Sequence, residues 1–443
     1  MPATPHVCII GATVWGNRGA EAMVTTCIGH LRQRFPQIHV SIFSYLPHRD
    51  RELVKDENIT IVDARPIALC LMFPFAVACW IAAKIGIRIA DALLPGPLRQ
   101  LRRSDAMLDV FGISFADGRE LFLPFNLLSL LPAFLLDVPV IKLSQAIGPF
   151  RNRLNRIAAR FTLRRCTKVF ARGEETAAHL RLLDLPADTW APASDLAFIY
   201  EPSYSLCSER PERLAAFKEK LQQLKARGAG MVAICPSSVV YNKAVKRQID
   251  YIGSLADMVK RIVQGDRQVL VIPHATREGL NTLRNNDLPV IELLRRRCAA
   301  DLPEAQMQRI LWTDFDVSSA GIRNLLQSTD LVITSRFHAM VAALALGIPP
   351  LVLGWSHKYR EVLKDFALQD CCFDIDHPDM DAFAARLAIM TRPDFQDAQR
   401  HKERLAAVQA ATTTQLDYVA LLLQQSPRRS QVTSPNRKAR AAH

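Results

Sequence analysis

The chain has 443 residues, of which 49% are hydrophobic and 22% are charged. This length excludes one small domain and indicates two or three domains with large cores. The net charge of +13 indicates an anionic partner, which can be nucleic acid, a phosphorylated or carboxylated substrate, or an acidic membrane surface.

The ten cysteines are spread along the chain, and none forms a C-x-x-C pair. This spread argues against a disulfide framework and against a zinc site, so we expect buried free thiols in a reducing compartment. The N-terminal sequence MPATPHVCIIGA passes directly into a strand-like run and does not resemble a secretory signal. We therefore expect a cytoplasmic protein.

The first part of the chain predicts a doubly wound α/β domain over residues 1–203. Residues 7–10 read as a buried strand, 11–20 as a glycine-rich loop, 21–34 as a helix and 38–43 as the next strand. Further strands are expected at 59–62, 106–111, 138–143, 168–171 and around Leu196.

An apolar segment at 67–98 interrupts this pattern, and its residues 67–83 carry no charge. Seventeen uncharged residues are the short limit for a membrane span. A single crossing would place strands of one sheet on opposite sides of a membrane, so we exclude it. Two alternatives stay open. One is a pair of core helices broken at Pro74. The other is an interfacial insertion with anionic headgroups near Arg88, Arg99, Arg102 and Arg103.

A basic segment at 151–172 contains eight basic residues and no acid. Arg153, Arg156, Arg160 and Arg164 follow helical spacing. A solvated face, or a surface facing phosphate or a membrane, explains this charge. Nucleic acid is not expected as a partner, because no aromatic stacking pattern or known reader motif accompanies the charge.

A second alternating series predicts another Rossmann-like domain at 204–400, after a boundary rich in Pro, Ser and charge at 200–213. Strands are expected at 231–235, 268–273, 309–312, 331–334 and 350–353, and helices at 214–227, 249–263, 278–298, 337–346 and 359–366. A closing helix at 401–425 and a disordered basic tail at 426–443 follow. Two such domains predict a ligand-binding cleft between the carboxyl ends of two parallel sheets.

The sequence Ser335-Arg336-Phe337-His338 joins the strand-like run LVIT to an apolar helix. Free N–H groups and the dipole at a helix start favour an anion. Arg336 adds a fork suited to carboxylate or phosphate, and His338 adds a group that exchanges protons near neutral pH. The pattern predicts a site for a small acidic ligand.

Three further groups are candidates for the same site. Lys358 opens the next helix and is expected on the same rim as a second anion contact, and His274 follows another strand. The small residues of Gly16-Asn17-Arg18-Gly19-Ala20-Glu21 let the backbone approach a ligand, with Gly16, Asn17, Gly19 and Glu21 as acceptor-side or loop candidates. This loop is not G-x-G-x-x-G, so a dinucleotide is weakly supported. Asp314 and Asp316 resemble a D-x-D metal pair, but such pairs also occur in caps, and no metal is predicted.

Several motifs together resemble the polysaccharide pyruvyl transferase family. They are GNRGAEA near the start, LDVFGISFADG (108–118), SQAIGPF (144–150), VFARGEETAAHL (169–180), SDLAF (194–198) and SRFHAMVAALALGIPPLVLGWSHK (335–358). They occur in the family's order, and the last motif is the most specific. The first loop departs from the family pattern at Ala20, where an acid is usual.

The resemblance implies a fold similar to GT-B glycosyltransferases, with two Rossmann-like domains facing a cleft. It implies transfer of a pyruvyl group from phosphoenolpyruvate to a sugar of a surface glycan or its lipid-linked precursor, as a pyruvate ketal. It associates Arg336, His338 and a second arginine, Arg172, with the donor, although Gly173-Glu174 replaces the usual Arg-Asp after Arg172. Together with the predictions made from the residues themselves, this gives Arg336 and His338 as catalytic candidates. The donor-binding candidates are Ser335, Arg336, Arg172, Lys358 and His274. No cofactor is expected beyond the donor substrate.

Two other functions stay open at this point. A GT-B glycosyltransferase using a nucleotide sugar would share the fold and a basic cleft. A non-catalytic glycan-binding or scaffold protein would tolerate the loss of His338 and Arg336. The expected location is the cytoplasm, with peripheral contact at the inner face of the cytoplasmic membrane as an added alternative.

Overall fold

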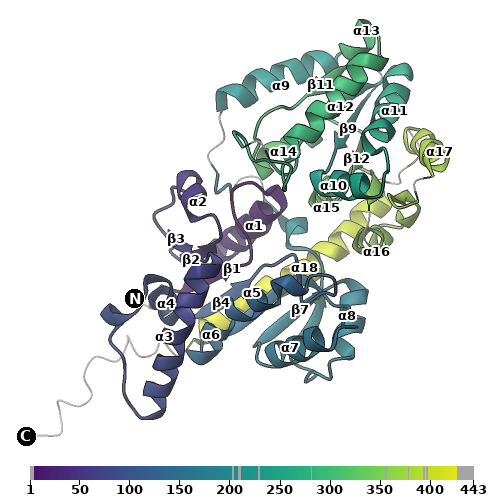
Figure 1. The fold of residues 1–443 in the computed structure, drawn as a ribbon. Coiled ribbons are helices and arrows are strands. Elements are labelled where there is room, and N and C mark those ends of the chain that lie inside the picture. Colours follow the sequence, from purple (N-terminus) through teal and green to yellow (C-terminus); the bar gives the residue numbers. More distant parts are fainter. Residues whose placement is uncertain are drawn as a thin grey trace, which may run out of the picture. The chain divides into compact units, whose positions relative to one another are not determined.

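The fold was examined in a computed structural model. It describes residues 4–201, 204–207, 211–227, 230–280, 282–354, 357–377, 379–392, 395 and 398–426. The predicted basic tail lies outside the described residues, apart from Ser426. The described chain is an α/β protein with two parallel sheets (Figure 1).

Contacts divide the chain into two compact units. Unit 1 comprises the described residues of 1–13, 23–196 and 410–443, and unit 2 those of 14–22 and 197–409. The loop at 14–22 thus groups with the second sheet, and the long C-terminal helix contributes to both units. The predicted domain limits at 203/204 and 400/401 stay predictions.

Unit 1 is built on a sheet with the strand order β3-β2-β1-β4-β6-β7-β8, in which β5 pairs with β6. The strands are β1 (His6–Ile10), β2 (His39–Ser44), β3 (Ile59–Asp63), β4 (Ala106–Asp109), β5 (Ile113–Ser114), β6 (Val140–Ile147), β7 (Lys168–Arg172) and β8 (Trp190–Ala193). The helical segments are α1 (Arg18–Arg34), α2 (Pro47–Leu53), α3 (Pro66–Lys84), η1 (Asp91–Leu93), α4 (Gly96–Arg103), η2 (Glu120–Phe122), α5 (Leu123–Leu128), α6 (Leu131–Leu135), α7 (Arg153–Leu163) and α8 (Gly173–Arg181).

Unit 2 has the strand order β11-β10-β9-β12-β13-β14. The strands are β9 (Met231–Cys235), β10 (Gln268–Val271), β11 (Ile310–Trp312), β12 (Leu331–Thr334), β13 (Pro350–Gly354) and β14 (Cys372–Asp374). The helical segments are η3 (Leu196–Ile199), α9 (Pro211–Lys225), α10 (Ser238–Lys246), α11 (Tyr251–Gln264), α12 (Leu288–Asp301), α13 (Glu304–Met307), α14 (Ser319–Leu326), α15 (Phe337–Ala345), α16 (His357–Asp365), η4 (Gln369–Cys371), α17 (Met380–Met390) and α18 (Ala398–Gln425).

The central strand β9 shows why these strands are continuously apolar. Val232 and Ile234 enter one hydrophobic core, and Met231, Ala233 and Cys235 enter another on the opposite face. Because successive side chains of a strand point to opposite faces, a sheet covered by helices on both sides buries all of them. The expectation of Rossmann-like sheets is confirmed in both units.

Two predicted elements are wrong in detail. The helix expected at 278–298 begins only at Leu288, because Pro289 fits the first turn of a helix and residues 282–287 form a loop. The strand expected around Leu196 lies earlier, as β8, and residues 196–199 form a 3₁₀ turn.

Helix α3 is continuous through Pro74, so the prediction of a helix pair broken there is wrong. Leu69, Met72, Ala76 and Cys79 form its buried face, and α3 packs against α4, α5 and α6. Among the described residues, α3 is long and apolar enough to cross a membrane, judged by length and composition. A crossing is excluded because β3 before it and β4 after it belong to one sheet.

Candidate functional site

Ser335 and Arg336 lie between the end of β12 and the start of α15. The Ser335 hydroxyl accepts a hydrogen bond from Tyr251 Oη at 2.8 Å, and its carbonyl accepts one from Tyr359 Oη at 3.0 Å. Burial raises the pKa of both tyrosines, so both stay protonated donors. The turn that presents the first residues of α15 is therefore held by two buried phenols.

The Arg336 guanidinium is held by a buried carboxylate. Nε donates to Asp287 Oδ2 at 3.0 Å, and Nη2 donates to Asp287 Oδ1 and, at 3.0 Å, to Ser238 Oγ. Nη1 donates to Asn285 Oδ1 at 3.2 Å. The arginine side chain is 13% exposed and the Asp287 side chain is fully buried. This is a bidentate pair of fixed geometry.

Asp287 also organises the backbone around Arg336. Its carboxylate accepts hydrogen bonds from the N–H groups of Ser238, His274 and Ala275 at 2.8, 3.1 and 2.9 Å. Sequence reasoning did not identify Asp287. An acid just before Leu288-Pro289 reads as a helix cap, but its side chain makes no cap hydrogen bond and binds Arg336 instead.

His338 lies in the first turn of α15, directly over Gly19. A Cβ atom added to Gly19 would lie 2.1 Å from His338 Nδ1, far inside contact distance. The ring also packs edge-on against Phe337, with centroids 5.2 Å apart. The structure therefore brings two predicted candidates, Gly19 and His338, into direct proximity, and a glycine is required there by space.

The other residues of the first loop are bound to the same unit. Asn17 Oδ1 accepts from the N–H groups of Gly19 and Ala20 at 3.2 and 3.3 Å, which caps α1. Gly16 has a φ of +79°, and its carbonyl accepts from the Thr276 N–H at 3.3 Å. Gly16 and Asn17 thus shape the loop through backbone geometry.

Glu21 takes part in a buried charge network centred on Arg18, which sequence reasoning missed. Arg18 donates to Glu21 and donates to both oxygens of Asp316, at 2.8 and 2.9 Å. Glu21 also accepts from the Ser319 N–H at 3.2 Å. Burial alone would lower the pKa of Arg18, but the carboxylates of Glu21 and Asp316 outweigh it and raise that pKa. Glu21 therefore has a structural role in fixing the loop.

His274 lies after β10 and is nearly fully buried. Its carbonyl accepts from the Arg18 N–H at 3.2 Å, and its own N–H binds Asp287. Burial, with the neighbouring His338, Arg336 and Arg18, lowers the pKa of His274 well below 6.5. His274 is thus neutral at pH 7 and joins the Arg336 region to the first loop.

Lys358 opens α16 and lies beside the start of α15. Its ammonium is 4.7 Å from the centre of the Phe337 ring and 5.5 Å from that of Tyr359. These are cation–π distances. Lys358 therefore adds positive charge near the turn that carries Arg336.

Arg172 belongs to unit 1, at the end of β7. It forms an ion pair with the buried Asp195 at 2.7 Å, and its second amino group donates to the Gly112 carbonyl at 2.9 Å. The other sequence-predicted site residues group in unit 2. A donor role for Arg172 stays a prediction.

Metal ligands do not gather in the described part of the chain, where no group of three or more His, Cys, Asp or Glu side chains is placed to hold an ion. Asp316 is bound to Arg18, and Asp314 lies 3.3 Å from Arg213. Both carboxylates of the D-x-D pair thus have cationic partners.

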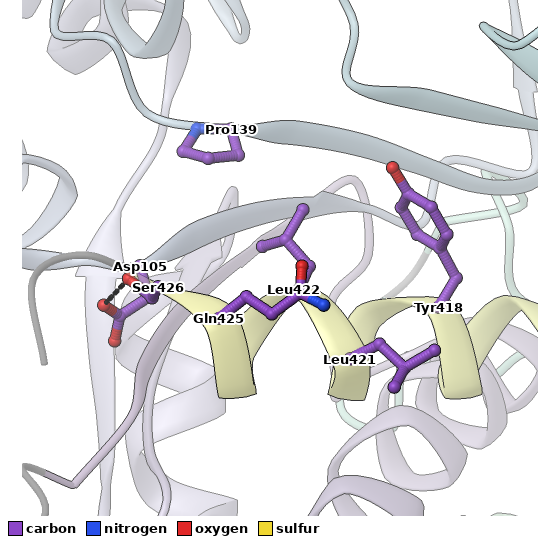
Figure 2. A pocket seen from close by; sticks show the side chains of 7 residues that line it. All are labelled: Asp105, Pro139, Tyr418, Leu421, Leu422, Gln425 and Ser426. Atoms are coloured by element: carbon purple, nitrogen blue, oxygen red, sulfur yellow. Dashed lines mark hydrogen bonds between the residues drawn. The ribbon is translucent and has the colours of Figure 1, made fainter.

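A cavity of about 460 Å³ lies elsewhere, in unit 1 (Figure 2). Its lining includes Asp105 and Pro139, which precede β4 and β6, and side chains of α18 from Tyr418 to Gln425. It is therefore at the amino ends of the strands. Ligands of such sheets bind at the carboxyl ends, so this cavity is not the candidate site.

Comparison with known proteins identifies relatives across most of the chain. The family model described as polysaccharide pyruvyl transferase matches residues 17–357. The chain is 21% identical over 391 residues to the amylovoran biosynthesis protein AmsJ of Erwinia amylovora, covering 83% of this chain and 88% of that protein.

The fold is similar to GT-B enzymes of known structure. The MnaA–UDP co-structure from S. aureus is matched with a TM-score of 0.58 and 11% identity over 96% of this chain and 99% of that one. A UDP-forming trehalose-phosphate synthase from Burkholderia vietnamiensis is matched with a TM-score of 0.55 and 13% identity over 95% and 97%. At such identities the likeness shows the fold alone.

Proposed function

Because the chain belongs to the polysaccharide pyruvyl transferase family, and so acts in glycan biosynthesis, we propose that its pyruvyl donor is phosphoenolpyruvate. The proposed acceptor is a pair of sugar hydroxyls in a surface glycan or its lipid-linked precursor, and the product is a pyruvate ketal. The proposed location is the cytoplasm, where phosphoenolpyruvate is made and the thiols of the chain stay reduced.

One observation carries this proposal: Arg336 and His338 flank the first residue of α15, and each is positioned by a separate contact. Asp287 fixes the guanidinium plane of Arg336, and Gly19 leaves space for the ring of His338. A cation and a proton-transfer group at a helix start match a small substrate that carries a carboxylate and a phosphate and whose reaction begins with protonation.

The proposed donor contacts follow from the charges at this turn. Four of the five N–H donors of Arg336 are engaged within the described protein, which leaves one at Nη1 for a ligand oxygen. The first N–H groups of α15 and the ammonium of Lys358 supply the remaining positive potential. We assign one anionic group of the donor to Arg336 and the other to the start of α15 with Lys358. One of these two sites would bind the carboxylate, and the other would bind the phosphate.

The proposed reaction needs one proton-transfer group and no redox step. His338 protonates the methylene carbon, and a sugar hydroxyl attacks the resulting oxocarbenium-like carbon. The C–O bond to phosphate then breaks, and the second hydroxyl closes the ketal ring. Of the two hydroxyl protons, one replaces the proton that His338 gave to the methylene carbon, and the other leaves with phosphate. The neighbouring cations stabilise the departing phosphate.

The donor assignment is tested by calorimetric titration with phosphoenolpyruvate, UDP-sugars and GDP-sugars. Arg336→Lys is the informative variant, because it keeps a cation beside the buried Asp287 but loses the fork. We expect phosphoenolpyruvate to bind the wild type and His338→Ala with similar affinity, and to bind Arg336→Lys at least tenfold more weakly. Binding of a nucleotide sugar alone would contradict the proposal and favour a glycosyltransferase.

A further inference from the structure

Unit 1 exposes an apolar helix end that its own fold does not cover. The end of α3 and the turn after it carry Trp80, Ile81, Ile85 and Ile87 on the surface, with Ile81 52% and Ile85 67% exposed. Figure 1 shows this end of α3 extending beyond the neighbouring helices α4 and α6. We call residues 80–88 the α3 tip.

The charge of the α3 tip has one sign. Its charged residues are Lys84 and Arg88, both exposed, and the segment contains no acid. The Lys84 ammonium lies 5.8 Å from the centre of the Trp80 ring. Tryptophan beside lysine or arginine is the composition favoured at a membrane interface, where the ring occupies the headgroup level and the cation meets phosphate.

A second apolar group lies on α7. Leu154, Ile157 and Phe161 are 71%, 64% and 42% exposed and recur at helical spacing. We call them the α7 stripe. Exposed arginines accompany the stripe, and no acid occurs between residues 151 and 165: Arg151, Arg153, Arg156, Arg160, Arg164 and Arg165. Arg165 lies over the Phe161 ring at 3.7 Å, and Arg160 pairs with Asp184 at 3.0 Å.

The two groups lie on helices that share a neighbour. Helix α5 contacts both α3 and α7, and η2 before it exposes Leu121 at 95% and Phe122 at 47%. Large apolar side chains on three elements that all contact α5 exceed the scattered exposure that is normal for a soluble surface. We propose that the α3 tip and the α7 stripe dock unit 1 onto an anionic lipid bilayer, without crossing it.

The balance of contributions favours a bilayer over a protein partner. Each isoleucine or leucine that enters the acyl boundary removes apolar surface from water, and each nearby cation is attracted by an anionic surface. A second copy of the chain would bring the same positive charge to the contact, which opposes self-association. This inference does not depend on the identity of the pyruvyl donor.

The test is flotation of the full chain with vesicles of phosphatidylcholine alone or with about 30% phosphatidylglycerol, which supplies the anionic surface that attracts basic segments. We expect binding to the anionic vesicles that weakens with salt. The pairs Ile81→Glu/Ile85→Glu and Leu154→Glu/Ile157→Glu should each reduce it at least tenfold. Val245→Glu/Leu293→Glu, at two exposed apolar residues of unit 2, adds the same charge, is the matched control and should bind as the wild type. Circular dichroism melting checks that all variants are folded.

Two results would overturn the proposal. If either double variant bound anionic vesicles as strongly as the wild type, the α3 tip and the α7 stripe would not be the docking surface. The basic residues after 426 remain in all variants and would then account for the binding. The wild-type protein could instead fail to bind vesicles and form a dimer in size-exclusion chromatography. If either double variant were then a monomer, the surface would be a contact with a second copy of the chain.

Discussion

At the scale of single residues, the space beside Gly19 determines where the His338 ring lies. Alanine is normally favoured over glycine in a helix by about 1 kcal/mol, and the backbone of Gly19 is not in the left-handed region. The clash with the imidazole reverses this preference, because the ring must move to admit a methyl group.

We therefore predict that Gly19→Ala lowers kcat by about 100-fold while the protein stays folded, since a displaced His338 would lose most of its proposed contribution as a general acid. The measurement is steady-state turnover beside the melting temperature. Gly96→Ala is the matched control, because nothing lies within 4 Å of the added Cβ at the start of α4. Wild-type turnover in Gly19→Ala would show that the position of His338 is unimportant.

The buried pair Arg336–Asp287 affects how variants at this site are interpreted. Removing Arg336 altogether leaves Asp287 as an unpaired buried charge, a change of about 3–5 kcal/mol in the free energy of unfolding. Loss of activity in Arg336→Ala would thus mix donor binding with stability. Arg336→Lys separates the two effects better.

Single residues were predicted where local sequence carries the signal. Arg336 and His338 follow a strand and open an apolar helix, so their place could be read directly. Asp287 and Arg18 could not be identified, because their roles depend on partners 49 and 298 positions away, respectively. Glu21 was predicted as an acceptor-side or loop residue, and the structure shows it bound to Arg18 and the Ser319 N–H.

At the scale of elements, strands were predicted well because buried parallel strands are short apolar runs between turns. Helix starts were less accurate. Gly279, Asn285 and Asn286 before Leu288 are weak helix formers. Asn285 adopts a positive φ of 54°, and Pro289 sets the first turn. The sequence left open whether α3 packs in the core or lies at a membrane interface, because an apolar run does not show which of its faces is covered.

Helix α18 is attached to unit 1 by a buried amide. Gln415 Oε1 accepts from the Ser144 N–H at 3.0 Å, and Nε2 donates to the Ser194 carbonyl at 3.1 Å. We predict that Gln415→Leu lowers the free energy of unfolding by about 2–4 kcal/mol, because the buried Ser144 N–H and the half-buried Ser194 carbonyl lose their partner. Urea unfolding measures this, with the exposed Gln424→Leu as control, for which a change within about 0.5 kcal/mol is expected. Equal effects of the two substitutions would contradict the role of Gln415.

At the scale of the whole molecule, the pair of Rossmann-like sheets was predictable, because each unit repeats the same alternation of strand and helix. The assignment of residues 14–22 to the second unit was not, because it depends on long-range contacts such as Arg18 with Asp316. Sequence order alone places that loop with the first sheet.

Acid stability is also a property of the whole molecule. Burial and the neighbouring His39 lower the pKa of His6 from 6.5 to about 4, and His274 shifts in the same direction. Near pH 6.5, these two histidines therefore bind more protons in the unfolded chain than in the folded chain. Stability should fall as pH decreases from 6.5 towards 4, by about 1 kcal/mol per pH unit for each histidine.

Melting temperatures measured between pH 7.5 and 4.5 test this expectation. His6→Gln should flatten the decrease below pH 6.5, whereas His48→Gln, at an exposed histidine, should keep the wild-type slope. A slope that His6→Gln leaves unchanged would contradict a neutral, buried His6.

The central claim is that Arg336 and His338 direct pyruvyl transfer from phosphoenolpyruvate. Its most direct test is phosphorus NMR of the purified protein with phosphoenolpyruvate and a lipid-linked saccharide fraction, followed by proton NMR of the glycan. The account predicts acceptor-dependent phosphate release in equal amount to a new ketal methyl signal, both abolished in His338→Ala. A ketal signal of wild-type strength in His338→Ala, or glycan modification that proceeds without phosphoenolpyruvate, would contradict it.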